Sequence, residues 1–182
     1  MAVSAPAQLS GELIAEAFAR EFAADAVTLV GGAAEPRYCA PTAGAPARLY
    51  FTADFPSSAL HEAAHWCLAG TRRRALDDFG YPYVPAAARS AADQLRFEAS
   101  EVRVQALEWL FSIAAGVRFH VSVDNLHRDS GALRAAVLHE TRRWLTEPLP
   151  PRAQRLRTAL AKRFGGVAQP DWDRLRCEAE HV

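Results

Sequence analysis

Cysteine is scarce in this chain of 182 residues, which contains only Cys39, Cys67 and Cys177. Because the cysteines are odd in number and far apart, they predict neither a disulfide framework nor a zinc knuckle. Cys67 lies in an apolar segment, and we interpret it as a small core residue. The cysteine content therefore argues against a fold that is held together by covalent cross-links.

The sequence also lacks an excess of charge and any long apolar run. Basic and acidic residues both number 21, so the net charge is zero and no strongly basic surface for nucleic acid is predicted. No apolar run reaches the length of a membrane span, and the first residues lack the pattern of a secretory signal. We therefore expect a cytoplasmic protein that neither contacts nucleic acid directly nor enters a membrane.

What is present is the composition of a globular protein. Hydrophobic residues make up 50% of the chain and charged residues 23%, values typical of soluble domains. A chain of this length can bury one sizeable core, and no internal repeat or low-complexity segment divides it. The sequence predicts a single domain over residues 1–182, which we expect to be a monomer.

Hydrophobic periodicity predicts a mostly helical α+β domain with a small β-sheet. The expected helices span about 8–24, 57–69, 89–115, 130–147, 151–164 and 171–180. The expected strands span 25–30, 48–52 and 117–123. Residues 31–47 and 77–83 are rich in glycine and proline, and we expect them to form connections.

The most informative motif is the pair of histidines in His61-Glu62-Ala63-Ala64-His65. Residues four apart stand on the same face of a helix, so both imidazoles can bind one metal ion. The pattern matches the HExxH motif of zinc proteases, whereas two histidines and a carboxylate can equally hold iron(II). The motif by itself leaves hydrolysis and oxygen chemistry open. Glu62 is a candidate for supporting the ligands or transferring protons.

The surrounding sequence predicts that the histidines lie on a largely buried helix. Ser57 and Ser58 are candidates for its N-cap, and Gly70 is the candidate for its C-cap. Between these limits the segment is apolar apart from the motif. We expect this metal-binding helix to pack against the long helix over 89–115.

A strip of polar residues on that long helix provides candidates for the third ligand. At 100° per residue, four side chains share one face, opposite Arg96 and Arg103: Glu98, Glu101, Gln105 and Glu108. An inward carboxylate needs a partner, which a metal or an arginine elsewhere would supply. We choose Glu101 as the third ligand, with Glu98 as the alternative. Glu98 also joins Glu62 among the catalytic candidates.

Five stretches, in order, resemble the bacterial elongation factor P hydroxylase family. They are LHEAAHWCLAG (60–70), DFGY (78–81), FEASEV (97–102), QALEWLF (105–111) and VSVDNL (121–126). The resemblance extends over about residues 8–165. It implies a zincin-like fold and a metal-dependent monooxygenase, whose partner and substrate is translation elongation factor P. The reaction implied is hydroxylation of its lysine, or β-lysyl-lysine, side chain.

Carried onto this chain, the resemblance assigns the metal to His61, His65 and either Glu98 or Glu101. For a hydroxylase we expect Fe(II), and the sequence leaves open whether an organic cosubstrate is used. Candidates for binding the substrate are Asp124, Asn125 and Tyr81. The alternative function is a zinc metallopeptidase of the HExxH type, in which Zn(II) binds and Glu62 activates water, or an inactive relative that only binds.

Overall fold

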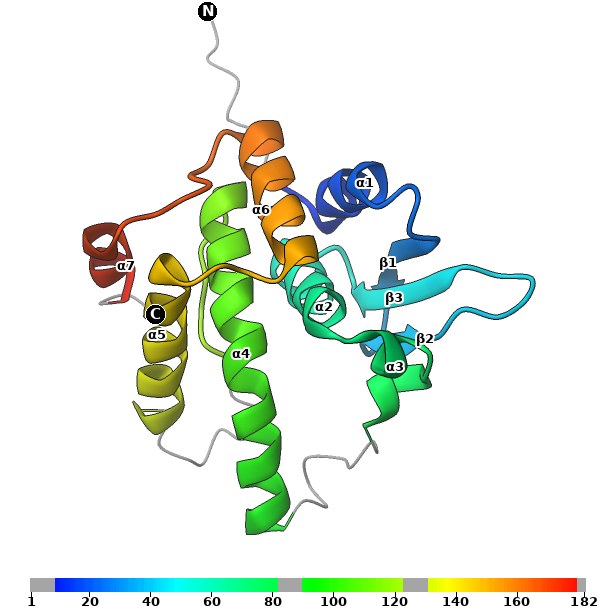
Figure 1. Ribbon diagram of the computed structural model, residues 1–182, viewed down its shortest axis with the longest axis horizontal. Coiled ribbons are helices and arrows are strands. Elements are labelled where there is room, and N and C mark those ends of the chain that lie inside the picture. The colour runs from blue at the N-terminus through cyan, green and yellow to red at the C-terminus, as the bar shows by residue number, and fades with distance from the viewer. Residues whose placement is uncertain (1–8, 82–89, 123–130, 180–182) are drawn as a thin grey trace, which may run out of the picture.

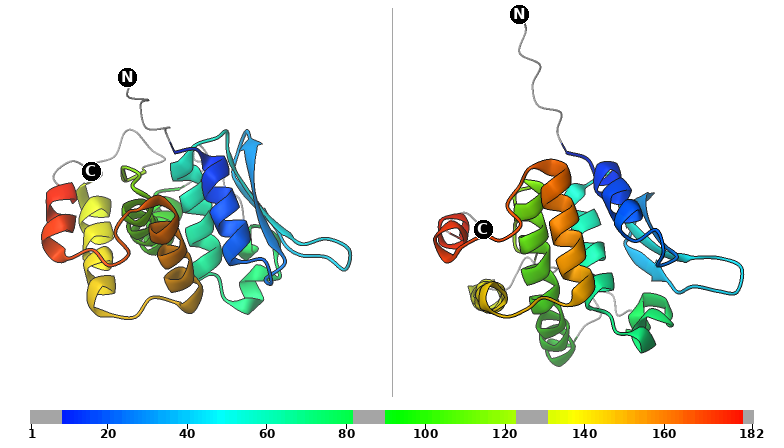
Figure 2. Two further views of the ribbon diagram at one scale, coloured as in Figure 1. Left: turned by 90° about the horizontal axis from the view of Figure 1, so that it is seen from above. Right: turned by 45° about the horizontal axis from the view of Figure 1, so that its top comes forward.

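The computed structural model describes residues 9–81, 90–122 and 131–179, and Figure 1 shows their arrangement. A small sheet lies at one side of the molecule, and most of the helices gather beside it (Figures 1 and 2). The predicted class, a mostly helical α+β fold with a small sheet, is confirmed. None of the described helices is long and apolar enough to cross a membrane.

The sheet in the described part of the chain has three strands in the order β1-β3-β2. Strand β3 (Ala47–Thr52) pairs in parallel with β1 (Val27–Ala33) and antiparallel with β2 (Arg37–Cys39). Alternate residues of β3 face the core, and Leu49 and Phe51 are fully buried there. Strand β1 continues through Gly31, where a Cβ atom would lie 2.8 Å from the Phe51 ring.

Helix α2 (Pro56–Leu68) carries the histidine motif, and its ends differ from the prediction. Phe55 occupies the N-cap position, and Pro56 opens the helix with a backbone already suited to it. Ser58 instead accepts a hydrogen bond from the Thr52 backbone N–H at 3.0 Å, joining α2 to the preceding strand. Ala69 is the C-cap residue, and Gly70 is the N-cap of the short helix α3 (Thr71–Arg74).

The long helix α4 (Ala91–Ala115) packs against α2, as predicted (Figure 1). Its other neighbours are α5 (Gly131–Thr146) and α6 (Pro151–Phe164), while α1 (Gly11–Glu21) packs against both α2 and strand β1. Helix α7 (Trp172–Ala179) contacts α5. Cys67 is 1% exposed and lies in the hydrophobic core, as predicted.

The strand predicted over 117–123 is wrong for residues 117–122, which form neither helix nor strand. The side-chain amide of Gln105 provides the pairing that a neighbouring strand would give. Its Nε2 donates to the Ser122 carbonyl at 2.9 Å, and its Oε1 accepts from the Ser122 N–H at 3.0 Å. One residue of the polar strip on α4 thus holds the chain that follows the helix.

Candidate metal centre

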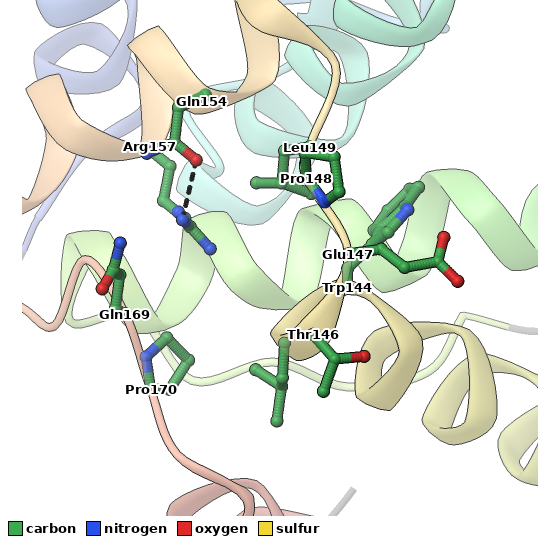
Figure 3. A pocket seen from close by; sticks show the side chains of 10 residues that line it. Trp144, Thr146, Glu147, Pro148, Leu149, Gln154, Arg157, Gln169 and Pro170 are labelled. Atoms are coloured by element: carbon green, nitrogen blue, oxygen red, sulfur yellow. Dashed lines mark hydrogen bonds between the residues drawn. The ribbon is translucent and has the colours of Figure 1, made fainter.

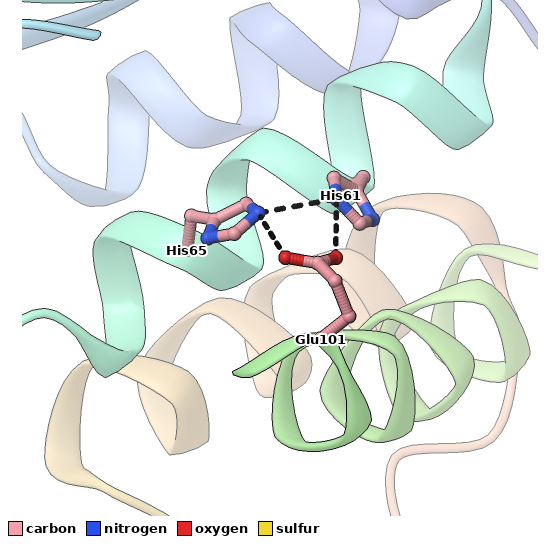
Figure 4. Close-up of side chains that lie close together, drawn as sticks. All are labelled: His61, His65 and Glu101. Atoms are coloured by element: carbon pink, nitrogen blue, oxygen red, sulfur yellow. Dashed lines mark hydrogen bonds and ion pairs between the residues drawn. The ribbon is translucent and has the colours of Figure 1, made fainter. Parts of the chain in front are cut away.

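His61 and His65 extend from the same face of α2, one helical turn apart (Figure 4). Their Nε2 atoms are 3.1 Å apart, and their ring planes meet at 74°. Around them the helix is buried through Leu60, Ala64 and Trp66, which fixes its position against the core. The histidine side chains themselves are 22% and 23% exposed, so a ligand can reach them from solvent.

Glu101 on α4 completes a three-residue group with the two histidines (Figure 4). Its carboxylate oxygens lie 3.3 Å from His61 Nε2 and 3.5 Å from His65 Nε2. Ligand atoms bound to one ion at about 2.1 Å are roughly 3.0–3.4 Å apart for bond angles of about 90–110°. The observed separations therefore suit one metal ion, and in the described part of the chain this is the one such group.

Glu108 lies two turns beyond Glu101 and supports the site from behind. Its Oε2 is 2.8 Å from His61 Nδ1, the ring nitrogen that faces away from the group. A hydrogen bond from Nδ1–H to a carboxylate fixes the ring orientation and leaves Nε2 as the free donor to a metal. We did not assign this role from the sequence, although the seven-residue spacing of Glu101 and Glu108 puts both on one helix face.

Burial and close opposite charges set the protonation of these groups. Burial opposes a charge on His61, but hydrogen bonds with Glu101 and Glu108 raise its pKa well above the usual value. Burial lowers the pKa of His65 to about 4, despite the nearby Glu101. Burial raises the pKa of Glu108, although its bond to His61 acts in the opposite direction. The negative charges of Glu101 and Glu108 favour a proton on the His61 ring, and they would likewise favour a metal cation bound to that ring.

The 3-10 turn η1 (Asp77–Gly80) covers the other histidine. Phe79 lies with its ring nearly parallel to His65 at 6.1 Å, and Tyr38 stacks on the far side of Phe79 at 4.1 Å. Asp78 and Phe79 both have positive φ, at 47° and 56°, a conformation that costs energy for residues other than glycine. Asp78 accepts a hydrogen bond from the Tyr38 N–H at 2.9 Å, which holds this turn in place.

The remaining predicted residues lie in different surroundings. Glu62 is buried at 6% exposure, no hydrogen bond from the described residues reaches its carboxylate, and burial raises its pKa to about 7. Glu98 is half-buried and is not in the three-residue group. Tyr81 is 48% exposed and lies under the Arg73 guanidinium, 4.2 Å from its ring centre. Asp124 and Asn125 lie outside the described residues.

The comparison with known proteins decides the family. A family model described as elongation factor P hydroxylase matches residues 15–172. This chain belongs to the elongation factor P hydroxylase family. It is 45% identical over 136 residues to the elongation factor P lysine hydroxylase of Haemophilus influenzae, an alignment that covers 72% of this chain and 76% of that protein. The predicted family is confirmed, and the match to the elongation factor P hydroxylase model contains His61, His65 and Glu101.

Proposed function

We propose that this protein hydroxylates a lysine side chain of translation elongation factor P, using a metal ion held by His61, His65 and Glu101. The observation that carries the proposal is membership of the elongation factor P hydroxylase family, over a region that includes the three-residue group. The relative from Haemophilus influenzae is named for the same reaction on lysine. The family favours hydroxylation over the zinc-peptidase alternative.

The reaction replaces one C–H bond of the substrate by C–OH. One atom of dioxygen enters the hydroxyl group, and the other leaves as water with two protons and two electrons from a reductant. A bare carboxylate cannot attack an unactivated C–H bond, so Fe(II) bound by two histidines and a carboxylate would supply the activation of dioxygen. The donor set of two imidazole nitrogens and one carboxylate supports this choice of metal.

The neighbouring residues have supporting roles in this proposal. Glu108 holds the His61 ring, and Phe79 confines the His65 ring; the 2.8 Å bond and the parallel stacking support these two roles. We assign to Glu62 the transfer of a proton beside the ligands, because it is buried next to His61 and its pKa is about 7. Glu98 is our candidate for contacting the substrate near Glu101, and we retain Asp124, Asn125 and Tyr81 as further substrate-binding candidates.

The test is the mass of elongation factor P purified from cells with and without this gene. We expect a gain of one oxygen atom on the lysine-bearing peptide that requires the gene and is lost with His61→Ala. His139→Ala is the matched control, because it removes an exposed histidine from α5. If the mass of the peptide is the same with and without the gene, the proposed reaction is wrong, and peptide cleavage with zinc becomes the next assay.

A further inference from the structure

A polar pocket lies away from the metal centre, between the end of α5, α6 and the segment that follows α6 (Figure 3). Its volume is about 450 Å³. Its lining residues include Trp144, Leu149, Gln154, Arg157 and Gln169. None of the pocket's lining residues belongs to the histidine and glutamate group described above.

The segment after α6, which forms the pocket wall opposite that helix, follows its path because of two glycines. Gly165 ends α6 in the left-handed conformation, at φ 78°. Gly166 then crosses α4 so closely that a Cβ atom would collide with the carbonyl oxygens of Ile113 and Ala114. The Val167 N–H donates to the Ile113 carbonyl at 3.3 Å, so the segment that carries Gln169 and Pro170 is fixed to α4.

Arg157 is a buried cation in this pocket. It is 5% exposed and lies on the face of α6 that otherwise buries Ala153, Leu156 and Leu160. Its guanidinium extends into the space toward Gln169 and Thr146 (Figure 3). Nη2 donates to Gln154 Oε1 at 2.8 Å, while Nε is buried without any hydrogen-bond partner.

Among the described residues, no carboxylate lies within ion-pair distance of Arg157, in contrast to Arg155 and Arg143 nearby. Arg155, two residues earlier, bonds Glu21 at 2.8 Å, and Arg143 bonds both Glu140 and Glu147. Glu147 lines the pocket, but it pairs with Arg143. A buried charge without a counter-charge is unfavourable, and burial accordingly lowers the pKa of Arg157.

We propose that this pocket binds a small oxyanion, phosphate or carboxylate, on the Arg157 guanidinium. A guanidinium presents its N–H donors in a planar fork that matches such oxygens, and in the described part of the chain only Nη2 of Arg157 donates to a protein group. The side chains of Gln169 and Thr146 supply neutral polar groups for the remaining oxygens. The volume of the pocket accommodates the anion together with part of the molecule that carries it.

The experiment follows the unfolding temperature of the full chain in Tris-chloride with a chelator. Inorganic phosphate and acetate are titrated separately, each against sodium chloride at equal ionic strength. We expect one of them to raise Tm saturably, by roughly 3–6 °C at about ten times its Kd. Arg157→Met abolishes the saturable rise, and the matched control Lys162→Met, which removes an exposed charge from the same helix, retains it.

Two further experiments show whether the rise in Tm comes from anion binding at Arg157 or at another site. His61→Ala retains the rise if the anion binds at Arg157, and loses it if the anion binds at the histidines. If Arg157→Met does not fold, the Arg157 Nε–H resonance of the unmodified protein is followed by NMR during the same titration and is expected to shift. The proposal is overturned if neither anion shifts that resonance or raises Tm saturably, or if Arg157→Met responds like the unmodified protein.

Discussion

The metal centre and the Arg157 pocket both bury charge, but they do so in opposite ways. At the metal centre two histidines converge with Glu101 and Glu108, and each group lies within 3.5 Å of another. At the pocket a single guanidinium is buried, with one amide oxygen as its partner. At the metal centre, each charged group is therefore stabilised by a neighbouring group of the protein. In the pocket, the Arg157 guanidinium has no counter-charge in the described protein and needs an external anion. The predictions below test this difference.

The largest effect is expected from Glu101→Ala. Removing the carboxylate from the three-residue group should lower metal affinity and the hydroxylation rate by more than about 100-fold, beyond the 10–100-fold typical of supporting residues. Glu98→Ala, the matched change one turn earlier, should retain one metal ion per chain. Metal analysis of the two purified variants distinguishes them. Equal loss of metal in both would show that the third ligand is misassigned.

A smaller effect is expected at Glu108, which contacts a ligand rather than a metal. Glu108→Leu should weaken metal binding about 10–100-fold, because His61 loses the acceptor for its Nδ1–H. Glu108→Gln retains an acceptor oxygen, so it should recover part of the affinity. Metal titration of both variants gives the comparison, and identical affinities for Gln and Leu would rule out a positioning role.

The two regions should also differ in stability when one charge is removed. Without metal, Glu101→Leu should cost about 1–3 kcal/mol in unfolding free energy, because both histidines lose the carboxylate that they share. Arg157→Met should leave the unfolding free energy in oxyanion-free buffer unchanged or raise it, because it removes an uncompensated buried charge and leaves no carboxylate unpaired. Urea unfolding at pH 7 measures both, and a costly Arg157→Met would mean that the protein already satisfies this cation.

The smallest loss of unfolding free energy is expected at the partly exposed ion pair of Arg143 and Glu140. This pair is the surface comparison for the two buried sites. A hydrogen bond from Arg143 lowers the pKa of Glu140 below its ordinary value of 4.5. Its contribution to stability is therefore present above pH 4.5 and is lost as the pH falls through the lowered value. Glu140→Gln should cost less than about 1 kcal/mol at pH 7. Unfolding curves at descending pH should show that gap closing, and a constant gap would contradict the assignment.

The helices were predictable because their apolar spacing is regular over many residues. The sequence placed α2, α4 and α6 within a few residues of their observed ends. Strand β2 was missed because it has three residues inside a segment rich in glycine and proline. It is held by contacts distant in the sequence, in which Asp78 and Asp77 accept the N–H groups of Tyr38 and Ala40.

The site was partly predictable for the same reason. The four-residue spacing of His61 and His65 and the polar face of α4 are local patterns, and together they indicated Glu101. The support of His61 by Glu108 and of His65 by Phe79 depends on how α2, α4 and η1 pack. The positive φ of Phe79 has no signature in the sequence Asp77-Asp78-Phe79-Gly80, so its approach to His65 could not be inferred.

The central claim is that one metal ion, held by His61, His65 and Glu101, is required for the hydroxylation of elongation factor P. The most direct measurement is the mass of elongation factor P, purified from cells that lack this gene, after incubation with purified protein, dioxygen and a reductant. The protein is used first after chelation and then after reloading with Fe(II). We predict a gain of one oxygen atom only after reloading, and none with Glu101→Ala. A gain of the same size from the chelated protein, or from Glu101→Ala, would contradict the account.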